Sequence, residues 1–86
     1  MQGRMILVRA IWDEAASVWV ASSDDVPGLV TEADTLERVR AKVLIMIPEL
    51  LDANNLSFDG PEIPVHFLAE QTARLVNPSA TVVATP

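Results

Sequence analysis

The feature that most constrains this 86-residue chain is the segment 35–51, TLERVRAKVLIMIPELL. It is the only stretch long enough, and apolar enough at helical spacing, to cover one face of a sheet. Five apolar residues recur three or four apart and predict one stripe of a helix: Leu36, Val39, Val43, Ile47 and Leu50. Asp34 or Thr35 can cap its first N–H groups, and with Asp34 as the N-cap, Glu37 takes the capping-box position. We therefore expect an amphipathic helix that needs a partner surface.

Pro48 interrupts this helical pattern. Inside a helix, proline removes one hydrogen bond and crowds the carbonyl of Leu44, at a cost of about 3 kcal/mol unless the helix bends. Pro48 either kinks the helix or opens a second short turn as its first residue, and we favour the kink. The run 43–47 is apolar on every side, which predicts cover from more than one direction. We expect Leu44, Ile45 and Met46 to contribute to an oligomer interface.

Composition fits a single small packed domain, because half of the residues are hydrophobic and 21% are charged. No apolar run approaches the roughly 18 residues that a membrane span needs. The first residues lack the pattern of a signal peptide, since Arg9 interrupts the apolar stretch and two acids follow it. The chain has no cysteine, which excludes disulfides and thiolate chemistry. We expect a cytoplasmic protein.

The net charge of −6 argues against direct DNA binding by this chain. Only six basic residues are present, and none lies among aromatic stacking residues. Three of them, Arg38, Arg40 and Lys42, are typical of the solvated face of a helix. An acidic domain suits a basic partner better, because complementary charge speeds their encounter.

Strands are predicted on both sides of the helix. The stretches 4–12, 17–22 and 29–32 read as three strands joined by turns, and 63–69 reads as a fourth strand entered through Pro64. The order β-β-β-α-β predicts an α+β fold, with a four-stranded mixed sheet in the order 3-2-1-4 and one helix on one face. The other face keeps apolar residues without cover, which predicts a homodimer or tetramer. We assign residues 1–76 to the domain and 77–86 to a C-terminal tail that is either frayed or docked on a neighbour.

Residues 12–54 resemble the HicB-like antitoxin family, and in particular its single-domain uncharacterised branch. The matching motifs are W12-D13-E14, V18-W19-V20-A21-S22, D25-V26-P27-G28-L29, T31-E32-A33-D34-T35-L36-E37 and I47-P48-E49-L50-L51. The resemblance implies a ribonuclease-H-like partial fold. It also implies a domain that binds and blocks a small basic toxin, which cleaves messenger RNA and is related to double-stranded-RNA-binding proteins. Many such antitoxins add a DNA-binding module, but only about eleven residues follow Leu75 here.

A ribonuclease-H-like enzyme would need clustered carboxylates to hold metal ions, the first of them in the middle of the first strand. That strand holds Arg4 and Arg9 and no acid. His66, the only histidine, has no serine or cysteine nucleophile pattern to serve and is typical of an ordinary strand residue. We therefore expect no catalytic residues, no metal and no cofactor.

Four residues are candidates for binding a partner protein. Trp12 and Trp19 lie on the first hairpin, where tryptophans serve either as core packing or as interface anchors. Asp24 and Asp25 are either a solvated loop or the acids that meet a basic toxin. The leading hypothesis is a non-enzymatic antitoxin-like domain that neutralises such a toxin by occlusion. The alternative is a stand-alone oligomeric module, structural or binding a small ligand, with no toxin partner.

Overall fold

The computed structural model describes residues 5–80. They form β1 (Ile6–Asp13), β2 (Val18–Ser22), β3 (Val30–Ala33), α1 (Leu36–Ala53) and β4 (Val65–Glu70). The sheet order is β3-β2-β1-β4, in which β1 pairs parallel with β4 while the other two pairings are antiparallel. The predicted α+β fold, strand order and single helix are thus confirmed. The expected strand start at Arg4 and the tail beyond residue 80 lie outside the described residues.

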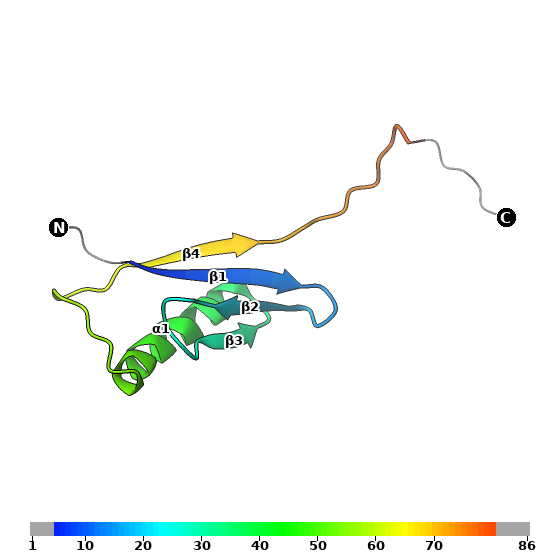
Figure 1. Ribbon diagram of the computed structural model, residues 1–86. Coiled ribbons are helices and arrows are strands. Elements are labelled where there is room, and N and C mark those ends of the chain that lie inside the picture. The colour runs from blue at the N-terminus through cyan, green and yellow to red at the C-terminus, as the bar shows by residue number, and fades with distance from the viewer. Residues whose placement is uncertain (1–4, 81–86) are drawn as a thin grey trace.

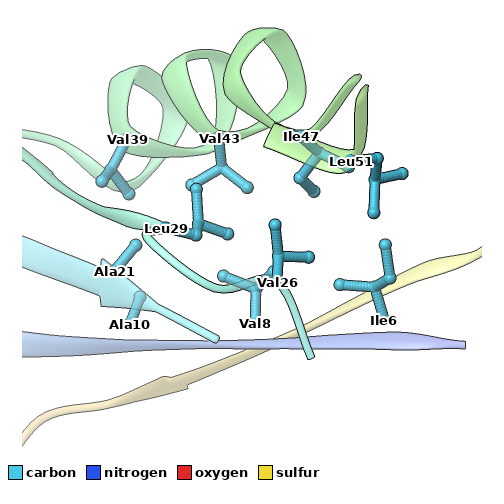
Figure 2. Close-up of a cluster of buried hydrophobic side chains, with 10 residues drawn as sticks. All are labelled: Ile6, Val8, Ala10, Ala21, Val26, Leu29, Val39, Val43, Ile47 and Leu51. Carbon is cyan, nitrogen blue, oxygen red and sulfur yellow. The ribbon is translucent and has the colours of Figure 1, made fainter. Parts of the chain in front are cut away.

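The core fills the space between α1 and one face of the sheet (Figures 1 and 2). Its buried side chains come from both layers and from the β2–β3 connection: Ile6, Val8, Ala10, Ala21, Val26, Leu29, Val39, Val43, Ile47 and Leu51. Alternate residues of a strand point to opposite faces, so the even-numbered residues of β1 face the helix. The opposite face of the sheet has no element over it among the described residues (Figure 1).

The helix begins at Leu36 with Thr35 as its N-cap, whose Oγ1 accepts a hydrogen bond from the Arg38 N–H at 3.1 Å. Asp34 does not cap the helix but forms an ion pair with the Arg38 guanidinium at 2.9 Å. Because Thr35 is the N-cap, the capping-box position falls on Arg38 and not on Glu37. The buried stripe is Val39, Val43, Ile47 and Leu51. The predicted stripe was wrong at two positions, because Leu36 is exposed and Leu50 is only half-buried. A repeat of four residues drifts around the helix, which brings Leu51 rather than Leu50 over the sheet.

The helix continues through Pro48 and ends at Ala53. Asn55 has a φ of 57°, the Leu56 N–H donates to the Leu51 carbonyl at 2.9 Å, and the Asn55 N–H donates to the Asp52 carbonyl at 3.1 Å. This is a Schellman motif with asparagine in the left-handed position. The Asn54 amide also donates to the carbonyl of Pro27 at 3.2 Å, which ties the end of the helix to the β2–β3 connection.

That connection is a tight turn over residues 26–29. The Leu29 N–H donates to the Val26 carbonyl at 3.1 Å, and Gly28 has a φ of 89°, as the third position of a type II turn requires. The turn folds Val26 and Leu29 into the core beneath the helix (Figure 2). The turn buries the Val26 side chain completely, although the two residues before it are exposed acids.

Candidate protein-binding surfaces

The two tryptophans lie side by side near the closed end of the β1–β2 hairpin. Trp12 and Trp19 are directly opposite each other in the ladder, with ring centroids 5.4 Å apart and planes tilted by 59°. Trp19 packs against the core, so it has a structural role. Trp12 is half-buried, and its indole N–H donates to Glu14 Oε1 at 2.8 Å. Trp12 is therefore the member of the pair that a partner can contact without disturbing the core.

A groove runs beside Trp12. Its lining comes from Ile11, Trp12 and Glu14 on the hairpin and from residues 70–74, which follow β4. The hairpin pattern predicted Trp12 as a partner-binding residue but not the groove, because the other wall comes from residues about sixty positions away in the chain. A local sequence pattern does not show that the hairpin and residues 70–74 lie next to each other.

The two loop acids have different surroundings. Asp25 Oδ2 accepts a hydrogen bond from the Leu7 N–H at 2.8 Å, and Ser23 Oγ donates to the Leu7 carbonyl at 2.6 Å. Asp25 is thus committed to the fold. Asp24 is exposed, and the described residues give it no hydrogen bond or ion pair. Of the two acids, Asp24 is the one free to meet a partner.

The structure does not bring the four predicted residues into one site. Asp25 bonds to Leu7 at one end of β1, whereas Trp12 lies five residues further along the same strand. At about 3.3 Å per residue, this places the acids and the tryptophans about 17 Å apart along the hairpin. A protein partner can span that distance, whereas a small ligand cannot.

The predicted oligomer residues lie on α1. Ile45 is 67% exposed on the outer side of the helix, and Leu44 is partly exposed beside it. Met46 packs against the core from the edge of the buried stripe. Within the described residues no element covers Leu44 or Ile45.

The open face of the sheet is a second apolar surface. It carries the residues that alternate with the buried ones in the strand registers: Leu7, Ile11, Val18, Val20, Val30 and Leu68. Ile11 is 49% and Val30 is 65% exposed. His66 lies on this face at the β4 edge, aligned with Leu7. An uncovered apolar face was expected because the one helix covers only one side of the sheet, but the residues that form this face depend on the register.

The surface is strongly acidic. All twelve acidic side chains are exposed, and two of them, Asp34 and Glu70, form salt bridges within the described residues. The bases are largely engaged: Arg9 pairs with Glu70 at 3.9 Å, Arg38 pairs with Asp34, Lys42 donates to the Glu32 carbonyl, and Arg40 lies over the Phe67 ring. Ten of the twelve carboxylates therefore have no ionic partner within the described residues.

Residues 5–80 offer neither of two other kinds of site. No group of three or more histidine or acidic side chains there is close enough together to hold a metal ion. No helix in the same region has the length and hydropathy needed to cross a membrane.

The sequence was compared with known proteins. No curated protein matches it. A hypothetical protein from the extremely thermophilic bacterium Thermus thermophilus, known from its crystal structure, is 51% identical. The match covers 86% of this chain and 100% of that chain, with a TM-score of 0.64. Residues 5–77 match the family described as Domain of unknown function (DUF1902). Since the match spans most of the chain, this protein belongs to the DUF1902 family.

Proposed function

We propose that this chain is a non-enzymatic protein-binding domain of the HicB antitoxin type. It neutralises a small basic toxin that cleaves messenger RNA, and it does so by covering the surface with which the toxin holds RNA. The observation that carries the proposal is the acidic surface, on which all twelve carboxylates are exposed while most of the described bases already have internal partners. The complex would form in the cytoplasm, where the messenger RNA is.

The residues that carry the HicB resemblance support this proposal through their positions. They form the end of β1, the hairpin turn and β2, the turn at residues 26–29, the entry to α1, and the last turns of that helix. Among these segments, the end of β1 and the hairpin turn contribute Trp12 and Glu14 to the groove, and the end of β2 adjoins the Asp24 loop. Occlusion needs a surface and no catalytic group, so the exposed acids and one aromatic anchor suffice.

The charges also define how such a complex would form. A basic toxin is attracted to the acidic domain from a distance, which raises the association rate at low ionic strength. Trp12 and Ile11, which line the groove together with Glu14 and Glu70, then give the complex its lifetime, because burial of apolar area slows dissociation. Protein interfaces commonly have charged and polar residues at the rim and apolar residues at the centre.

The proposal predicts a gene for a small basic protein beside the gene for this chain, and co-expression of the two proteins tests it. Induced alone, the basic protein is expected to stop growth and degrade messenger RNA; with the chain present, growth is restored and the two co-purify. Asp24→Lys should weaken rescue, because it reverses a free charge without touching a contact of the fold. Glu49→Lys, which makes the same change on the exposed side of α1, is the matched control. A neighbour that is harmless, or one that the chain neither binds nor neutralises, contradicts the proposal.

The alternative, a stand-alone oligomeric module that is structural or binds a small ligand, is favoured by a different observation. The groove beside Trp12 has one aromatic wall and polar side chains from residues 70–74. In that case the chain would not change the activity of any protein encoded by a neighbouring gene. The Trp12→Ala variant would then leave growth unchanged in every co-expression while altering ligand binding.

A further inference from the structure

The segment that follows β4 contributes no side chain to the hydrophobic core. Residues 71–77, here called the C-terminal arm, have no ladder partner, and every one of them is exposed. Leu75 is 90% and Val76 is 87% exposed. Figure 1 shows the arm running on from β4 beyond the end of the sheet. Two large apolar side chains held in water at the end of an unpaired segment call for a covering surface.

Within residues 5–80 the outer edge of β4 is also unpaired, because β4 lies at the end of the sheet and bonds to β1 alone. The Ile6 N–H donates to the Pro64 carbonyl at 3.0 Å, so the even-numbered residues of this strand point their backbone groups toward β1. Val65, Phe67 and Ala69 therefore point their N–H and C=O groups outward. An edge of this kind is a template for a further strand.

We propose that residues 65–77 of two copies of this chain pair antiparallel about a two-fold axis at Gln71. Pro64 and Pro78 bound this run, and Gln71 is its central residue. Proline ends a strand because it has no N–H to donate. The register centred on Gln71 therefore pairs the whole run, and the arm of each copy covers the free β4 edge of the other.

This register brings chemically matched side chains together. Directly opposite residues of an antiparallel pair lie on the same face, so Leu75 meets Phe67 of the second copy on the helix side. Phe67 is half-buried beneath Arg40, whose guanidinium carbon is 5.7 Å from the ring centroid, and Leu75 would cover its open side. On the other face, Arg74 lies diagonally beside Glu70 of the second copy. Arg74 has no ionic partner among the described residues, and Glu70 has only a 3.9 Å contact with Arg9.

A second copy fits better than the arm's own body. The arm cannot fold back onto its own β4 edge, because the chain first turns at residues 77–80, after the arm has ended. There the Ala80 N–H donates to the Asn77 carbonyl at 3.3 Å, and the Ser79 N–H donates to Asn77 Oδ1 at 2.9 Å. A two-fold exchange satisfies both arms and both edges at once, as a closed isologous interface does. This dimer does not depend on the proposed toxin binding.

The first test is the mass of the purified full chain in solution. Sedimentation at low protein concentration should give about twice the 9.3 kDa of one chain. Ala73→Pro removes an N–H that points at the second copy and should give a monomer. Thr72→Pro is the matched control, because its N–H points to the other side and the dimer should persist. A monomeric parent chain, or an Ala73→Pro variant that stays dimeric, overturns the proposal; circular dichroism shows that each variant is folded.

The second test reads the register directly. Because the chain has no cysteine, Gln71→Cys places one thiol per copy at the axis. Facing Cα atoms there are about 5.5 Å apart, within disulfide range, and mild oxidation should link the two copies. In Ala73→Cys the two thiols are offset by four residues, about 13 Å, and should not link. A link through position 73 and none through 71 would contradict this register.

Discussion

Asp25 completes the first strand from a loop: its carboxylate accepts a hydrogen bond from the backbone N–H of Leu7, 18 residues earlier, at 2.8 Å. β2 ends at Ser22, opposite Arg9, so it offers no backbone partner to Leu7. The Ser23 hydroxyl donates to the Leu7 carbonyl and accepts from the Asp25 N–H at 3.1 Å. Two side chains thus extend the ladder where the strand stops, and this assigns Asp25 to the fold and leaves Asp24 without a contact in it.

This difference predicts unequal stabilities for two neighbouring variants. Asp25→Ala leaves the Leu7 N–H without its acceptor and should lower the free energy of unfolding by about 1–2 kcal/mol. Asp24→Ala should change it by less than about 0.5 kcal/mol, as for most exposed positions. Urea denaturation followed by circular dichroism measures both. Equal losses would show that the Leu7 contact contributes nothing to stability.

The tryptophan pair predicts a separation of stability from binding. Trp19→Ala should cost about 2–3 kcal/mol of folding free energy, because Trp19 packs against the core. Trp12→Ala should cost about 1 kcal/mol, mainly the loss of the ring pair. Binding of the basic partner should nevertheless weaken at least about tenfold in Trp12→Ala, as expected for an aromatic anchor. Calorimetric titration measures the affinity, and an unchanged value would remove Trp12 from the interface.

The turn at residues 26–29 predicts a backbone effect. Gly28 has a φ of 89°, and a Cβ there would lie 3.4 Å from Leu50 Cδ2 on the helix. Gly28→Ala should therefore destabilise the protein by about 1 kcal/mol or more. Asn55→Gly, at the left-handed end of α1, should instead raise stability by a few tenths of a kcal/mol. The midpoint temperature of thermal unfolding should fall in Gly28→Ala and rise in Asn55→Gly. A shift of both midpoints in the same direction would contradict the turn geometry.

The outer side of the helix predicts a second contact between copies. If Ile45 and Leu44 join two arm-exchanged dimers, the parent chain is a tetramer at high concentration, and Ile45→Lys reduces it to a dimer. Glu62→Lys, in the exposed loop before β4, introduces a lysine elsewhere with an even larger change of charge and should leave the tetramer intact. Sedimentation across a concentration series distinguishes the two. A parent chain that never exceeds a dimer excludes this interface.

The architecture was predictable from sequence because it follows from periodicity and chain order. The apolar stripe from Leu36 to Leu50 predicted the helix, and the right-handed crossover rule placed β4 beside β1. The ends were less predictable. Leu51 replaced Leu50 in the core, and Thr35 rather than Asp34 capped the helix, because each choice depends on where the helix lies over the sheet.

The surfaces were predictable only in part. Trp12 and Trp19 were identifiable as hairpin aromatics, but their contact depends on a register that the turn sets. The Asp25 contact with Leu7 and the groove beside Trp12 both join residues far apart in the chain. A local sequence pattern can identify such residues, but it does not show which residues lie next to them. The structural role of Asp25 and the absence of contacts at Asp24 therefore became visible only in the three-dimensional structure.

The central claim, that this acidic domain occludes a basic RNA-cleaving partner, is tested most directly by cleavage of messenger RNA with purified components. Addition of the chain to the neighbour-encoded protein should suppress cleavage in proportion to the amount added, with cleavage ending near equal molar amounts. The Asp24→Lys chain should need a higher concentration for the same effect, and its deficit should shrink at raised salt, which screens the reversed charge. Cleavage that continues unchanged in a molar excess of folded chain would contradict the account.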